Sequence, residues 1–218
     1  MKSRRIHLMG ASGSGVTTLG RALAARLALP HHDSDDYFWL PTAPPYQTTR
    51  PAAERLRLMR EMFLPRRDWV LSGTVTGWGD ELVPFFDLVV FVTTPRELRL
   101  QRLRGREATH FGADAVAQGG WRHEETESFV EWASRYEAGD REGRSLTKDE
   151  AWLAGLPCPV VRIDGSRRLR ILSSSYAAKR SGYPADVILL RSHLKNNEAG
   201  REPCSTDAAS CLPPLPPE

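Results

Sequence analysis

The stretch of sequence that decides the fold is Gly10-Ala11-Ser12-Gly13-Ser14-Gly15-Val16-Thr17-Thr18. Its three glycines favour turns with positive φ, so the stretch neither continues a strand nor begins a helix. Residues 4–9 before it form a short apolar run that predicts a strand, and residues 17–28 after it carry apolar side chains at helical spacing. In such a strand–turn–helix unit, backbone N–H groups converge on one anion, and the helix N-terminus adds a positive dipole. The stretch therefore predicts a phosphate-binding loop.

The loop departs from the usual phosphate-loop pattern at one position. The pattern G-x-x-x-x-G-x-T is met by Gly10, Gly15 and Thr17, but Val16 stands where a P-loop has lysine. The backbone N–H groups do not need that lysine, and neither does the Thr17 hydroxyl, which is expected to hold Mg²⁺. Because the lysine normally reaches the β- and γ-phosphates, its loss is expected to weaken catalysis more than phosphate binding.

The rest of the first 165 residues alternates between strand and helix patterns. Further strands are predicted at 31–33, 69–71, 87–92 and 159–163, and further helices at 51–64, 95–104, 121–136 and 146–156. Residues 39–51 contain four prolines and predict a loop. The run at 87–92 is the clearest strand, and its apolar residues suit a parallel strand covered on both faces. The alternation predicts an α/β fold built from right-handed βαβ units around a parallel sheet.

The composition limits the class of protein. The chain has 218 residues, 40% of them hydrophobic, and no apolar run approaches the roughly 20 residues of a membrane span. No signal-peptide pattern follows the N-terminus, and the three cysteines have neither metal-ligand nor redox spacing, so a cytoplasmic location is expected. Residues 166–218 predict a disordered tail with eight basic and five acidic residues, which leaves 22 of each sign in the first 165. We therefore expect the fold to bind neither nucleic acid nor membrane.

The order of several motifs is typical of one family of proteins. The motifs are the loop itself, Asp33-x-Asp35-Asp36, Trp69-Val70-Leu71-Ser72-Gly73, Phe86-Asp87-Leu88-Val89-Val90-Phe91 and the alternating arginines Arg102, Arg104 and Arg106. Over residues 4–165 the chain resembles P-loop small-molecule and nucleoside-monophosphate kinases. The likeness is to bacterial adenylate-kinase-like proteins, related to the shikimate kinase, gluconate kinase and topology-modulation-protein groups. The resemblance implies a three-layer fold with a five-stranded parallel sheet in the order 2-3-1-4-5, a domain at 1–165 and a small mobile lid at about 105–121. The tail at 166–218 does not resemble the family.

The resemblance also implies roles for individual residues. The loop residues would surround the phosphates of ATP, with Thr17 and Asp33 at Mg²⁺: Gly10, Ser12, Gly13, Ser14, Gly15, Val16, Thr17 and Thr18. Asp33 and Asp35 follow the second strand and would lie near the γ-phosphate. One of them would order magnesium through water, and the other would orient or deprotonate the acceptor hydroxyl. Without the loop beside it, the same acidic cluster would indicate only a helix cap and a solvated turn.

Other residues are candidates for the acceptor site and for the missing positive charge. Gly73 would let the acceptor approach the backbone, Arg50 would meet an acidic group on it, and Trp78, between two glycines, would line its pocket. Arg99, Arg102 and Arg106 share one helical face, which is either a solvated basic face or a phosphate clamp. Because position 16 is apolar, we predict that Arg102, Arg104 or Arg106 supplies part of the charge of the absent lysine.

These features predict an ATP-dependent phosphotransferase with Mg²⁺. It would move the γ-phosphoryl group to a nucleoside monophosphate or a small hydroxylated metabolite, and the chain would be a monomer or a weak dimer. The alternative is a nucleotide-binding protein without catalysis, which Val16 favours. The acidic and arginine clusters favour the enzyme, because a protein that only binds nucleotide does not need both.

Overall fold

The computed structural model describes residues 3–140 and 142–166. Its centre is a five-stranded parallel sheet in the order β2-β3-β1-β4-β5. The strands are β1 (Arg4–Gly10), β2 (His31–Asp33), β3 (Asp68–Ser72), β4 (Leu88–Thr93) and β5 (Val160–Asp164). The helices are α1 (Val16–Leu27), α2 (Ser34–Phe38), α3 (Ala52–Met62), α4 (Arg96–Phe111), α5 (Ala113–Val116), α6 (His123–Ser134) and α7 (Leu146–Ala154), with a 3₁₀ helix, η1, at Asp80–Phe85. The predicted fold class and strand order are confirmed.

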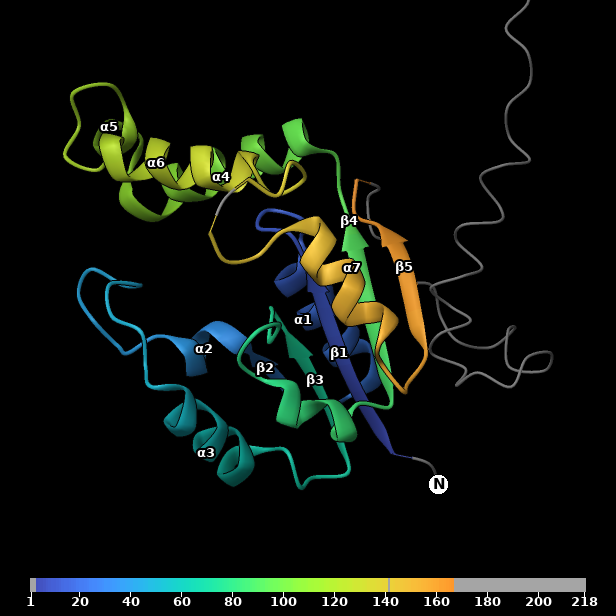
Figure 1. The fold of residues 1–218 in the computed structure, drawn as a ribbon. Helices are drawn as coiled ribbons and strands as arrows, with labels where there is room; N and C mark the ends of the chain where they lie inside the picture. The colour runs from blue at the N-terminus through green and yellow to red at the C-terminus, as the bar shows by residue number, and fades with distance from the viewer. Residues whose placement is uncertain (1–2, 141, 167–218) are drawn as a thin grey trace, which may run out of the picture. The chain divides into compact units, whose positions relative to one another are not determined.

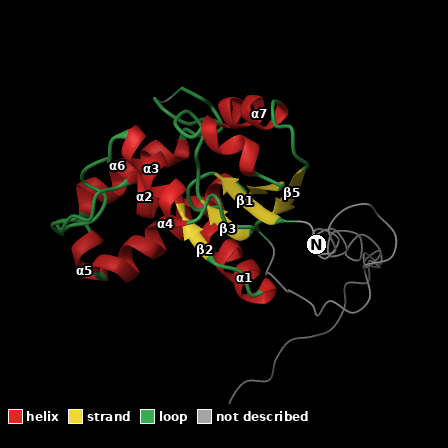
Figure 2. Ribbon diagram, turned by 90° about the horizontal axis from the view of Figure 1, so that it is seen from below, coloured by secondary structure: helices red, strands yellow, loops and turns green. Residues whose placement is uncertain are grey.

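Helices cover both faces of the sheet. Figure 2 shows α1 on one side of the strands and α7 on the other. The helix α1 buries one apolar stripe against the sheet, formed by Val16, Leu19, Leu23 and Ala24. The strands β1 and β4 pair along their length, from Ile6 opposite Leu88 to Gly10 opposite Val92. Both strands are nearly continuously buried, as expected for the middle of a parallel sheet.

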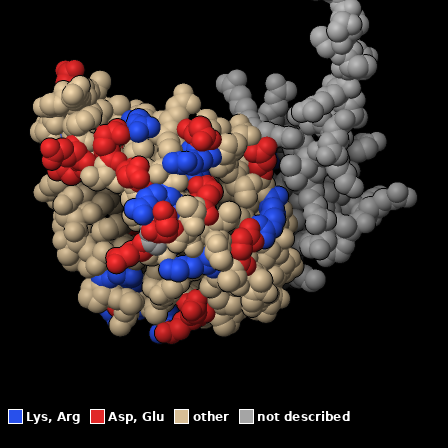
Figure 3. Space-filling model, turned by 45° about the horizontal axis from the view of Figure 1, so that its top comes forward, with Lys and Arg blue, Asp and Glu red and all other residues tan. Residues whose placement is uncertain are grey.

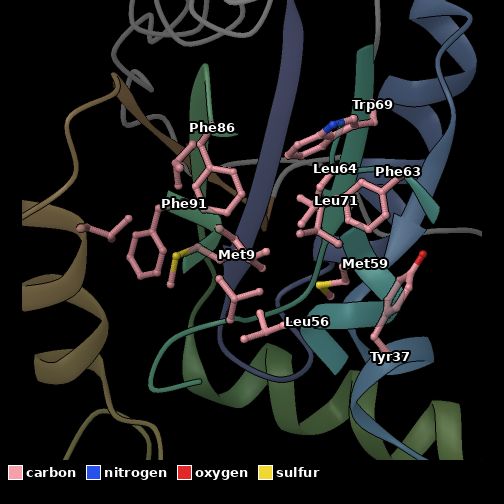
Figure 4. Close-up of a cluster of buried hydrophobic side chains, with 14 residues drawn as sticks. Met9, Tyr37, Leu56, Met59, Phe63, Leu64, Trp69, Leu71, Phe86 and Phe91 are labelled. Atoms are coloured by element: carbon pink, nitrogen blue, oxygen red, sulfur yellow. The ribbon is translucent and has the colours of Figure 1, made fainter. Parts of the chain in front are cut away.

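The main core lies on the face of the sheet opposite α1. Aromatic side chains dominate it, and each large apolar side chain that is fully buried stabilises the fold by about 1.5–3 kcal/mol. Figure 4 shows Phe86 and Phe91 beside Met9, and Phe63 and Trp69 beside Leu64 and Leu71. The rings of Phe63 and Trp69 meet edge to face with their centroids 5.1 Å apart. This packing fixes the carboxyl ends of β1, β2 and β3, where the predicted site residues lie.

The acidic turn after β2 is a short helix, which the sequence pattern did not predict. Asp33 caps it, because its carboxylate accepts a hydrogen bond from the backbone N–H of Asp35 at 3.2 Å. The turn therefore holds Asp35 and Asp36 in the first turn of α2. Their positions are set by the helix and not by a flexible loop.

The range predicted as a lid, 105–121, has more regular structure than expected. Residues 105–111 are the last turns of α4, and α5 follows before the chain turns back into α6. The helices α4 and α6 pack against one another through Leu103, Val130 and Ala133. Figure 1 shows α4, α5 and α6 together as a helical arm. Good helix formers around Gly105 outweigh its low helix propensity.

The predicted tail lies, apart from Ser166, outside the described residues. In the part of the chain that is described, no helix is both long enough and apolar enough to span a membrane.

A buried histidine in β1 predicts how stability depends on pH. The His7 side chain is fully buried, its Nδ1 atom lies 3.2 Å from the Leu71 carbonyl oxygen, and its ring stacks on Phe86. Burial, with a smaller contribution from the charge of Arg144, lowers the pKa of His7 to about 3. In the unfolded chain, His7 takes up a proton near pH 6.5. The contribution of neutral His7 to the free energy of unfolding is therefore fully present above pH 6.5. It is lost as the pH falls from 6.5 toward 3, by up to about 1.4 kcal/mol per pH unit.

The measurement is urea unfolding of the wild type and of His7→Gln at pH 7.5 and pH 5.0. Glutamine is polar and of similar size but takes up no proton in this pH range. We expect the wild type to lose about 2 kcal/mol more than the variant between the two pH values. Equal losses in both proteins would show that His7 is not the group that titrates.

Candidate active site

The loop between β1 and α1 has the backbone geometry of an anion cradle. Gly13 and Gly15 have φ values of 81° and 95°, in the region that favours glycine. Gly15 is the N-cap of α1 and has no side chain with which to bond the first turn. The N–H groups at this helix terminus therefore have no side-chain cap and remain as donors for a ligand.

Side chains from outside the loop occupy its carbonyl oxygens. The bonds run from Arg144 Nη2 to Gly10 (3.0 Å), from Arg99 Nη1 to Ser12 (3.1 Å), and from Thr94 Oγ1 and Arg102 Nη1 to Ser14 (3.1 and 3.4 Å). These carbonyl oxygens are thus engaged by side chains of the protein. What the loop still offers to an incoming group is N–H donors, which favour an anion.

Arg99 is a structural support for the loop. Its side chain is only 1% exposed, and it forms a two-pronged ion pair with Glu137 in addition to the bond to Ser12. The helix that carries it packs directly on the loop, because a Cβ atom added to Gly13 would lie 2.5 Å from the Arg99 carbonyl oxygen. Part of the arginine face that the sequence identified therefore holds the loop in shape.

Thr17 and Asp33 come together, as the resemblance implied. The Thr17 hydroxyl donates a hydrogen bond of 2.8 Å to Asp33 Oδ2. A hydroxyl and a carboxylate are the hard oxygen donors that Mg²⁺ prefers, so this pair fits the ion. Among residues 3–140 and 142–166, no group of three or more His, Cys, Asp or Glu side chains could hold a metal alone. The remaining ligands would come from phosphate and water, as is usual for Mg²⁺.

Asp35 and Asp36 face different neighbours. Burial, followed by the charge of Asp33, raises the pKa of Asp35 to about 6, while Arg106 and Arg144 act in the opposite direction. Burial and Asp33 also raise the pKa of Asp36, while the charge of Arg21 acts in the opposite direction. Asp35 is therefore the carboxylate that lies toward α4 and the segment before α7, where the loop-binding arginines originate.

The three candidate arginines have different surroundings. Arg102 lies at the loop, with Nη1 3.7 Å from where a Cβ on Gly15 would be, and its Nη2 bonds the Gly165 carbonyl. Arg106 is within electrostatic reach of Asp35. Arg104 points elsewhere and pairs with Glu127 on the surface.

Arg102 differs from Arg99, Arg104 and Arg106 of the same helix in that it forms no ion pair with the described acidic residues. Figure 3 shows Lys and Arg side chains interspersed with Asp and Glu on the face that it draws. Pairs such as Arg135 with Asp140 and Arg162 with Glu150 are typical of the described surface. Within the described part of the chain, Arg102 bonds only carbonyl oxygens, so its charge is available to an anion at the loop.

The three acceptor-site candidates have different surroundings in the structure. All three donor nitrogens of Arg50 are engaged, by the Tyr37 carbonyl, the Trp39 carbonyl and Glu54, so this residue holds the proline-rich loop against α2. Gly73 has φ +100°, and a Cβ there would lie 1.9 Å from Ser34 Oγ, so internal packing alone requires glycine. Trp78 is half-buried, and Phe38 meets its ring edge to face.

Sequence reasoning missed two arginines. Arg55 is buried, with its guanidinium carbon 3.8 Å from the Phe38 ring centroid and 5.3 Å from that of Trp78, and its Nε bonds the Arg50 carbonyl. No acidic partner of Arg55 occurs among the residues that the structure describes. Arg144 reaches Gly10 from the segment before α7. Neither has a local motif, and only the apolar spacing of α3 could have indicated that Arg55 points inward.

Comparison with known proteins gives a clear relative. No protein-family model matches the chain. The uncharacterized protein YqaC of Bacillus subtilis (strain 168) is 44% identical over 161 residues, which are 74% of this chain and 88% of YqaC.

Three solved structures illustrate the more distant similarity. They are shikimate kinase from Bacteroides thetaiotaomicron (20% identity, 74% of this chain and 86% of that chain, TM-score 0.41), a gluconokinase from Sinorhizobium meliloti 1021 (15%, 90% and 96%, 0.41) and shikimate kinase from Acinetobacter baumannii in complex with shikimate (16%, 91% and 95%, 0.41). Similarity at this level says nothing about the reaction or the substrate.

Proposed function

We propose that this chain, which belongs to the family of YqaC from Bacillus subtilis, transfers the γ-phosphoryl group of ATP to a nucleoside monophosphate or a small hydroxylated metabolite. The observation that carries the proposal is the loop at 10–18, whose carbonyls are held from outside and whose helix terminus has no side-chain cap. A hydroxyl–carboxylate pair suited to Mg²⁺ adjoins it at Thr17 and Asp33.

The chemistry follows from what these residues offer. The loop N–H groups would bind the donor phosphates, and Thr17 and Asp33 would hold Mg²⁺, which neutralises phosphate charge when bound. For a hydroxylated acceptor, Asp35 would orient the hydroxyl and accept its proton as the hydroxyl oxygen bonds to the γ-phosphorus and ADP leaves, whereas a nucleoside monophosphate would accept the group on an ionised phosphate oxygen without a base. Arg102 and Arg106 would offset the charge that develops on the transferred group. Positioning and charge neutralisation would supply most of the rate.

Arg55 supports an acceptor with an acidic group. A buried guanidinium that stacks on aromatic rings without a carboxylate partner is suited to bind phosphate or carboxylate in two places. Both classes of acceptor can meet this requirement, a nucleoside monophosphate through its phosphate and a metabolite through a carboxylate. The panel of acceptors should therefore contain both anions, together with neutral sugars.

The test is ADP formation from ATP and Mg²⁺ in the presence of each acceptor. We expect one acidic acceptor to raise the rate of ADP formation well above the rate with ATP alone. Tight ATP binding without ADP formation on any acceptor would instead support the non-catalytic nucleotide-binding protein. Failure to bind ATP at all would refute both functions.

A further inference from the structure

Position 16 directs its side chain toward the start of the loop. Val16 is 8% exposed, and its Cγ2 atom lies 3.2 Å from where a Cβ on Gly10 would be. The first carbon atoms of a longer side chain at this position would lie beside Gly10. The neighbourhood of Gly10 is therefore where the charge of a lysine at position 16 is missing.

Arg144 brings a positive charge to that same residue. It immediately precedes Ser145, the N-cap of α7, and its Nη2 donates a hydrogen bond of 3.0 Å to the Gly10 carbonyl. Besides burial, which dominates, the charge of Arg144 acts to lower the pKa of both Asp35 and His7. Arg144 thus lies at the end of β1, within electrostatic reach of the carboxylate assigned to the acceptor.

A buried carboxylate fixes the direction of Arg144. Asp149 in α7 is completely buried. Its Oδ2 atom accepts a hydrogen bond of 2.6 Å from Arg144 Nη2 and another of 2.7 Å from the Tyr136 hydroxyl. Burying such an ion pair contributes little net stability, because the desolvation of both charges offsets their attraction. Its effect is to hold the guanidinium in one orientation at the loop, which is what a phosphate-binding group needs.

We infer that Arg144, held by Asp149 and Tyr136, contacts the β- and γ-phosphates of the bound nucleotide in place of the lysine that is absent at position 16. This inference rests on the proposed function, because it takes the loop to be the donor site. The guanidinium presents several donors in one plane, so one nitrogen can keep Asp149 while another meets phosphate. The positive charge is then supplied from a residue 128 positions beyond Val16.

The experiment measures the affinity for three probes, AMP-PNP, ADP and AMP, each with Mg²⁺, by calorimetric titration. The proteins are the wild type, Arg144→Met, Val16→Lys and the double variant, with Arg135→Met as the control because Arg135 pairs with Asp140 on the surface. We expect Arg144→Met to weaken AMP-PNP and ADP by about 10- to 100-fold, the loss of a charge-assisted contact, and AMP much less. Lysine at position 16 should restore most of that loss in the double variant but give no gain in the wild type, where Arg144 already supplies the charge.

Removal of Arg144 leaves Asp149 without its buried partner, so Arg144→Met risks unfolding. Arg144→Met/Asp149→Asn removes both charges and keeps an acceptor for Tyr136, and the same titrations with and without Val16→Lys are then made on it. The inference is wrong if the folded variant binds AMP-PNP as tightly as the wild type, or if lysine at position 16 restores nothing. Wild-type protein that binds none of the three probes would refute the proposed function itself.

Discussion

Asp35→Asn is expected to lower kcat for phosphoryl transfer to a hydroxylated acceptor by a factor of about 10² to 10⁴, the usual contribution of a positioned general base. The amide keeps the size of the side chain and cannot take the proton of the acceptor hydroxyl. Because Asp35 is assigned to the acceptor and not to the donor phosphates, the affinity for ATP should change little. The measurements are the steady-state rate with the acceptor found by the panel and a calorimetric titration with AMP-PNP.

Asp36→Asn is the matched control for this prediction. Asp36 is the next residue of the same helical turn, but the arginine whose charge acts on its pKa is Arg21 and not one of the loop-binding arginines. We expect this variant to retain nearly the wild-type rate. A similar loss of rate in both variants, or none in Asp35→Asn, would show that Asp35 is not the base.

Gly13→Ala is expected to abolish tight nucleotide binding. The residue has φ +81°, and a Cβ there would lie 2.5 Å from the Arg99 carbonyl oxygen, which belongs to helix backbone and cannot move alone. The left-handed conformation costs alanine about 1–2 kcal/mol, and relief of the clash would distort the loop. Loss of two or more charge-assisted N–H contacts predicts a decrease in AMP-PNP affinity of about 100-fold or more.

Gly105→Ala is the control for Gly13→Ala, because it adds the same methyl group at a glycine outside the loop. Gly105 lies exposed in α4, and a Cβ there meets nothing within 4 Å. Alanine should stabilise the helix by about 0.5–1 kcal/mol and leave binding unchanged. Both variants are followed by thermal unfolding and by titration with AMP-PNP. Wild-type affinity in Gly13→Ala would mean that the loop does not bind the nucleotide through its backbone.

The sequence predicted the parts of the fold that depend on local pattern. Glycines between a strand and a helix indicated the loop, and the apolar run at 87–92 indicated the central strand β4. The helix α2 was missed because it has five residues, too few for a periodic pattern, and forms through the cap from Asp33. The end of α4 was missed because Gly105 resembled a break in the helix.

In the candidate site, too, the features that follow from local motifs could be predicted, and those that depend on contacts between distant residues could not. Thr17 and Asp33 could be paired in advance because each follows directly from a strand end or the loop motif. The roles of Arg50 and Arg55 could not be predicted, because Arg50 precedes α3 and Arg55 lies in its first turn, and neither belongs to a motif. Only the folded chain shows that carbonyls and Glu54 engage Arg50, whereas aromatic rings surround Arg55. The place of Arg144 at the loop is defined by its hydrogen bond to Gly10, 134 positions away, and no local motif encodes that contact.

The most direct test of the proposed activity is the destination of the γ-phosphoryl group. Wild type and Asp35→Asn are incubated with Mg²⁺, the selected acceptor and ATP that carries labelled phosphorus in the γ position, and the products are separated by chromatography. The label should appear on the acceptor in an amount equal to the ADP formed, and much more slowly in the variant. Label that stays on ATP with every acceptor, or that passes only to inorganic phosphate, would contradict the assignment of a phosphotransferase.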